Sequence, residues 1–139
     1  MKPQFLIPLL SLLILAGSFA LPAHISAKNQ TSDDVELIAI RMYADWCGYC
    51  KELDGKLDNV KSELKDDRIW FTYFDITDEF MQQQTKTMAN KLNLGHIYEQ
   101  YNGQTGLMVI VNPQNGEVIK EITSDISEED LTSEILSLL

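Results

Sequence analysis

YADWCGYCK occupies residues 43–51 and holds the only two cysteines of this 139-residue chain, Cys47 and Cys50. The run VELIAIRMY at residues 35–43 leads into it and is apolar and rich in β-branched residues, which is typical of a strand covered on both faces. A helical pattern begins inside the stretch, because apolar residues recur three and four positions apart from Cys50 to Leu64. The sequence therefore predicts that both cysteines lie where a strand passes into a helix.

Similar patterns follow along the chain. We expect further strands at residues 69–74, 106–111 and 117–122, and a helix at 79–92. Residues 96–105 are predicted to be a loop, and the last helix is expected to be capped by Ser127 with Asp130 three residues later. The buried side of the 79–92 helix is predicted to consist of Phe80, Met81, Met88, Ala89 and Leu92. This order indicates an α/β fold with a central mixed sheet flanked by helices.

The first 27 residues differ from the rest. They contain Lys2, no acidic residue, a long leucine-rich apolar run and then small residues, which is the pattern of a secretory signal peptide. An uncleaved membrane anchor is the alternative, since the run is about as long as a short membrane span. The polar residues 28–34 are predicted to form a flexible linker, and residues 35–139 one domain. We therefore expect a periplasmic or otherwise extracytoplasmic protein.

The charge of the chain bears on its partners. Without residues 1–27, ten basic residues face 21 acidic ones, a net charge of −11. Such a surface repels nucleic acid, so nucleic acid is not expected as a partner. Contact with a membrane is expected only through residues 1–27, and the domain is predicted to be a monomer.

The spacing of the two cysteines favours redox chemistry over a structural role. A disulfide between residues three positions apart closes almost no loop and removes little chain entropy. At a helix N-terminus, unpaired amides and the helix dipole would lower the pKa of the Cys47 thiol below the free value of about 8.5. Cys47 is then the nucleophile toward a substrate disulfide, and Cys50 resolves the mixed disulfide. This chemistry needs no metal or organic cofactor, and it requires that the Cys47 sulfur be reachable from solvent.

Other interpretations of the cysteine pair are weaker. A zinc site needs about four ligands, and His96 is the only histidine after residue 27. Covalent haem attachment needs a histidine after the second cysteine, where this chain has Lys51. An inert disulfide in a binding or chaperone-like domain stays open as a second hypothesis.

The stretch at residues 43–51 resembles the active site of the thioredoxin family, and the order of elements from residue 35 to 139 is similar to the thioredoxin fold. YADWC with the following Lys51-Glu52 most resembles periplasmic thioredoxin-like domains, such as the C-terminal domain of the bacterial membrane disulfide reductant transporter. The resemblance implies a thiol–disulfide oxidoreductase that acts on protein thiols and disulfides together with a redox partner protein. Trp46, Gly48 and Tyr49 are then expected beside the attacking sulfur.

Two positions depart from the pattern that this resemblance implies. Thioredoxins carry a buried aspartate six residues before the first cysteine, where this chain has Arg41. A cation there would stabilise a thiolate and make the pair more oxidising, unless an acid such as Asp75 pairs with it. Glu52 is a candidate for handling the proton of Cys50, and ordinary helix surface is the alternative.

The second departure lies in the loop before the 106–111 strand, where thioredoxins place a cis-proline facing the cysteines. Gln104-Thr105-Gly106 occupies that place here. A cis bond at a residue other than proline costs ~2.5–4 kcal/mol, so we expect a trans peptide at Thr105. Thr105 is predicted to lie opposite the dithiol, and Tyr98 and Tyr101 either line the groove or pack in the core.

Overall fold

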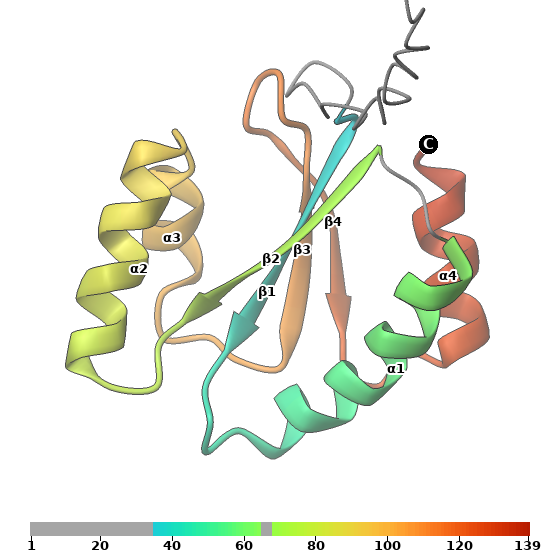
Figure 1. Ribbon diagram of the computed structural model, residues 1–139, viewed down its shortest axis with the longest axis horizontal. Coiled ribbons are helices and arrows are strands. Elements are labelled where there is room, and N and C mark those ends of the chain that lie inside the picture. Colours follow the sequence, from blue (N-terminus) through green and yellow to red (C-terminus); the bar gives the residue numbers. More distant parts are fainter. Residues whose placement is uncertain (1–34, 65–67) are drawn as a thin grey trace, which may run out of the picture.

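The computed structural model describes residues 35–64 and 68–139, and Figure 1 shows a central sheet with helices on both sides. Along the chain the elements are β1 (Leu37–Tyr43), α1 (Gly48–Leu64), β2 (Ile69–Asp75), α2 (Glu79–Lys91), α3 (Gly95–Tyr101), β3 (Leu107–Val111), β4 (Val118–Thr123) and α4 (Glu128–Ser137). Within the described residues the four strands are arranged in the order β2-β1-β3-β4. The pair β1/β2 is parallel, whereas β1/β3 and β3/β4 are antiparallel. The predicted mixed sheet is confirmed.

The central strand β1 contributes side chains to two hydrophobic cores. Ile38, Ile40 and Met42 pack on the side of α2 and α3, while Leu37 and Ala39 pack on the side of α1 and α4. Successive residues of a strand point to opposite faces, so an unbroken apolar run is what a strand covered on both sides requires. β1 therefore ends firmly fixed between two layers of helices, and the cysteine stretch begins at that end.

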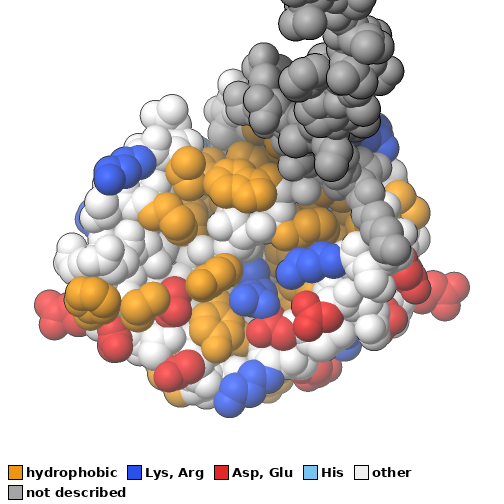
Figure 2. Space-filling model, in the orientation of Figure 1, with side chains coloured by type: hydrophobic (Ala, Val, Ile, Leu, Met, Phe, Trp, Pro, Cys, Tyr) orange, Lys and Arg blue, Asp and Glu red, His pale blue; other side chains and the backbone are white. Residues whose placement is uncertain are grey.

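β2 is one of the two edge strands of the described sheet, and it is less covered than β1. Trp70 and Tyr73 point to opposite faces of this strand, and both are exposed. Figure 2 shows, in the orientation of Figure 1, hydrophobic side chains interspersed with charged ones on the surface.

Two details of the prediction were wrong. The 96–105 stretch is not a loop throughout, because it contains most of α3, whose Ile97, Tyr98 and Tyr101 are buried. No side chain caps this short helix at Leu94, so packing rather than a local signal holds it. Because no capping residue marks its start, the sequence pattern did not predict this helix.

The buried side of α2 is also different from the predicted one. Ala89 is buried as expected, but Thr85 is the other buried residue, and Phe80 is 67% exposed. Met88 and Leu92 are exposed as well. The reason is polar: the Thr85 hydroxyl donates to the backbone oxygen of Asp75 at 2.8 Å and accepts from its N–H at 3.2 Å, which turns this face of α2 toward the end of β2.

The start of α4 is confirmed. The Ser127 hydroxyl accepts a hydrogen bond from the Asp130 N–H at 3.1 Å, and Leu131 and Ile135 are fully buried. No helix within residues 35–64 and 68–139 is both long and apolar enough to cross a membrane. The predicted signal peptide or anchor and the predicted linker lie outside the described residues.

Replacing Thr85 with valine tests how α2 is attached. The change keeps the shape of the side chain but leaves both backbone groups of Asp75 without their partner, so we expect a loss of about 1–3 kcal/mol in the free energy of unfolding. Urea denaturation measures this loss. Thr87→Val is the matched control, because the Thr87 hydroxyl bonds only to Gln83 of its own helix at an exposed site. Equal losses in the two variants would contradict the prediction.

Candidate active site

Cys47 and Cys50 form a disulfide at the junction between β1 and α1. The chain leaves β1 at Tyr43 and makes a turn in which the Cys47 N–H donates to the Ala44 oxygen at 3.1 Å. α1 then begins at Gly48, so Cys47 stands directly before the helix and Cys50 in its first turn. The predicted placement of the pair at a strand-to-helix junction is confirmed.

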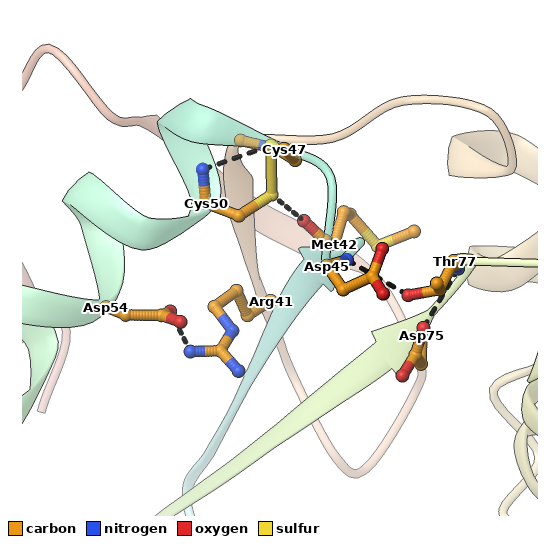
Figure 3. The surroundings of a disulfide bond; sticks show 9 residues. Arg41, Met42, Asp45, Cys47, Cys50, Asp54, Asp75 and Thr77 are labelled. Carbon is orange, nitrogen blue, oxygen red and sulfur yellow. Dashed lines mark hydrogen bonds and ion pairs between the residues drawn. A yellow bond between two sulfur atoms is a disulfide. The ribbon is translucent and has the colours of Figure 1, made fainter.

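Backbone amides donate hydrogen bonds to both sulfurs, and Figure 3 shows the one at Cys47. The Cys50 N–H, one of the free amides of the first turn, donates to Cys47 Sγ at 3.0 Å. The Gly106 N–H donates to Cys50 Sγ at 3.2 Å. The donor at Cys47 favours a thiolate there once the disulfide is reduced.

The second cysteine has an additional neighbour that matters in the reduced form. Cys50 Sγ lies 3.5 Å from the Met42 oxygen. A disulfide sulfur has no hydrogen to donate, but a Cys50 thiol could donate to this carbonyl. The Met42 carbonyl therefore favours the protonated thiol at Cys50, whereas the Gly106 N–H acts in the opposite direction.

The exposure of Cys47 differs from the expectation. The residue is only 4% exposed in the disulfide form, against 0% for Cys50. Both belong to the core cluster on the side of α2 and α3. Cys47 is the more accessible of the two as predicted, but a partner has to approach it closely between the residues on either side of it.

Trp46 and Tyr49, which lie close to Cys47 in the sequence, have exposed side chains. Trp46 is 63% exposed and Tyr49 69% exposed, and nothing lies within 4 Å of where a Cβ at Gly48 would be. Trp46 is fixed by its indole N–H, which donates to the Thr77 oxygen at 3.0 Å, and the Asp45 N–H donates to Thr77 Oγ1 at 3.0 Å. Thr77, in the β2–α2 connection, was missed by the sequence analysis because it is about thirty residues away along the chain.

The loop before β3 meets the dithiol through the Gly106 N–H, and the position of the Thr105 side chain opposite the dithiol stays a prediction. No peptide bond in the described residues is cis, as expected for Thr105. Gly106 has a φ of 75°, and a Cβ added to it would lie 2.7 Å from the Tyr49 Cβ. Glycine is therefore needed here both for the backbone conformation and for the close approach to Tyr49.

The other predicted site residues are held by contacts of their own. Tyr98 and Tyr101 are buried in the core, so they pack rather than line a groove. Glu52 is exposed and pairs with Lys56 at 2.9 Å, as ordinary helix surface does. Arg41 pairs with an acid, but with Asp54 of α1 instead of the expected Asp75. No group of three or more histidine, cysteine or acidic residues that could hold a metal exists within residues 35–64 and 68–139.

Gly106→Ala tests the contact between the loop and Tyr49. A positive φ costs an alanine roughly 1–2 kcal/mol, and the close contact adds about 1–3 kcal/mol more. Gly103→Ala is the matched control, because Gly103 has a φ of 89° and nothing within 4 Å of an added Cβ. We expect Gly106→Ala to lower the unfolding free energy of the oxidised protein by the larger amount. Equal losses would show that the Tyr49 contact has no energetic weight.

Comparisons with known proteins agree with this geometry. A family model described as Thioredoxin matches residues 24–104. The protein disulfide-isomerase of Arthroderma benhamiae is 33% identical over 84 residues, which cover 49% of this chain and 16% of that protein. The chain thus spans about one sixth of the length of this curated relative.

Solved structures share the fold at low identity. Thioredoxin-2 of a malaria parasite is 16% identical with a TM-score of 0.50, over 73% of this chain and 82% of that chain. A mutant thioredoxin from Halobacterium salinarum is 20% identical with a TM-score of 0.48, over 76% of each chain. Because the family model covers more than half of its residues, the chain belongs to the thioredoxin family.

Proposed function

We propose that this protein is a thiol–disulfide oxidoreductase that exchanges disulfides with protein substrates through Cys47 and Cys50. The observation that carries the proposal is the hydrogen bond from the Cys50 N–H to Cys47 Sγ at the start of α1. It gives the sulfur at residue 47 a donor that stabilises a thiolate, which is the form that attacks disulfides. Membership of the family and the partial match to a protein disulfide-isomerase support the same chemistry.

The exchange proceeds in two balanced steps. The Cys47 thiolate attacks one sulfur of a substrate disulfide, so a mixed disulfide forms and one substrate thiolate leaves. Cys50 then loses its proton and attacks Cys47 Sγ, which releases the second substrate sulfur and forms the Cys47–Cys50 disulfide. Two electrons pass to the substrate, and the reverse sequence oxidises a substrate dithiol. The cysteines carry the electrons themselves.

Substrates and a redox partner protein are expected to contact the exposed surface beside Cys47. Trp46 and Tyr49 offer large apolar side chains there, and Trp46 is already held by Thr77. Fixed aromatic side chains contribute contact area at a low cost in conformational entropy. Thr105 and Gly48 border the same approach to the sulfur in this proposal.

Insulin reduction tests the activity. In the presence of a thiol reductant, we expect the wild-type protein to accelerate insulin reduction and Cys47→Ser to abolish the acceleration. Cys50→Ser should retain the first attack and accumulate a mixed disulfide, because no second sulfur resolves it. Mass spectrometry of the trapped adduct identifies the attacking residue. Adducts through residue 50 in a Cys47→Ser protein, with full activity, would contradict the assignment.

A binding domain with a structural disulfide is the second candidate, and the 4% exposure of Cys47 favours it. In that case the reduced protein would show no faster reaction with iodoacetamide than an ordinary free thiol. The oxidoreductase proposal instead requires Cys47 to be alkylated first, at a rate that reports a pKa below the usual value of about 8.5.

We further propose that the protein is exported and works in the periplasm or another extracytoplasmic space. The apolar run within residues 1–27 and the oxidising environment that a disulfide needs support this location. When the whole chain is produced in a bacterial host, we expect the periplasmic fraction to contain a protein that begins at Lys28. Mass spectrometry of the purified protein measures this start. Recovery of the uncut chain from the membrane fraction would indicate the anchor instead.

A further inference from the structure

An ion pair joins β1 to α1, the helix whose first turn holds Cys50 (Figure 3). Arg41 lies two residues after Ala39 and four after Leu37 on β1, and these two pack on the α1 side of the sheet, so the Arg41 side chain points to that side as well. There its guanidinium donates to the Asp54 carboxylate (Figure 3). Asp54 follows Cys50 by four residues, one helical turn, or about 6 Å along the helix axis. Asp54 is therefore the charged residue that lies one turn after Cys50 on the same face of α1.

The surroundings of this pair screen its charges poorly. The side chains of Arg41 and Asp54 are only 18% and 29% exposed. The guanidinium carbon lies 5.0 Å from the centre of the Tyr43 ring and 5.5 Å from that of Tyr73. Burial lowers the pKa of Arg41 from its usual value, and Arg41 Nε is buried without a hydrogen-bond partner among the described residues. An unbalanced charge here would act strongly on a nearby thiolate.

We propose that Asp54 is a positioning residue that neutralises Arg41 and thereby sets the balance between the disulfide and the dithiol at Cys47 and Cys50. The inference rests on the proposed exchange chemistry. A cation stabilises a thiolate and hence the reduced protein, so Arg41 alone would make the pair more oxidising. A carboxylate alone would do the opposite. With both residues present, the effects of the two charges on the redox equilibrium of the cysteine pair largely cancel.

A cycle of substitutions separates these opposing effects. Asp54→Asn removes the carboxylate paired with the cation, so that only the weaker attraction of Asp58 and Asp75 acts on Arg41, and Arg41→Met leaves the Asp54 carboxylate without its cation. We expect the equilibrium constant for reduction of the disulfide by glutathione to rise about threefold to tenfold in Asp54→Asn. It should fall by a similar factor in Arg41→Met and return close to the wild-type value in the double variant. A tenfold change corresponds to about 30 mV in the potential of the pair.

Two further variants make the readout specific. Asp54→Glu keeps the negative charge and should stay close to wild type, which also decides the question if Arg41→Met does not fold. Glu134→Gln is the matched control, since Glu134 pairs with Lys120 at 2.9 Å between α4 and β4, away from the cysteines. Its equilibrium constant should not change.

The proposal is overturned if Asp54→Asn and Arg41→Met shift the constant in the same direction, or if Asp54→Asn shifts it no more than Glu134→Gln does. It is equally overturned if Asp54→Glu behaves like Asp54→Asn. Failure of the proposed function looks different: the wild-type protein then does not accelerate insulin reduction, while the glutathione equilibria of the variants still shift in opposite directions.

Discussion

The hydrogen bond from the Cys50 amide to the Cys47 sulfur depends on the whole central part of the fold. It exists only because α1 starts directly after Cys47, and α1 starts there because β1 ends at Tyr43 between two layers of helices. The apolar stripe of α1, with Leu53, Leu57 and Val60, packs the helix on the sheet. Burial of this stripe thus fixes the position of the amide donor as well as stabilising the domain.

The cysteine pair and the layers around it could be predicted from the sequence, because their signals are local. Spacing of three and four residues marks α1, an unbroken apolar run marks β1, and Ser127 with Asp130 marks the start of α4. The contacts that complete the site are not local. Thr77 reaches Trp46 across about thirty residues, and Gly106 reaches Cys50 across 56. No pattern along the chain indicates contacts between residues so far apart in the sequence.

The errors in the prediction have a common cause, which is that tertiary packing outweighed hydrophobicity. In α2 a threonine was preferred over Met88 and Leu92 as a buried residue, because it satisfies the backbone at the end of β2. In α3 the burial of Tyr98 and Tyr101 stabilises a helix too short to form alone. Arg41 pairs with an acid as expected, but with Asp54 of α1 and not with the example named, Asp75, the last residue of β2, whose carboxylate accepts a hydrogen bond from the Thr77 N–H.

Both sulfurs receive their hydrogen bonds from main-chain amides, at Cys50 and Gly106. A main-chain donor is specified by the path of the backbone and not by the identity of a side chain, with Gly106 as the exception because its φ is positive. Substitutions at the residues between and around the cysteines can therefore change which partners the surface binds without removing the hydrogen bonds to the sulfurs. The chemistry and the specificity of this protein are in that sense free to evolve separately.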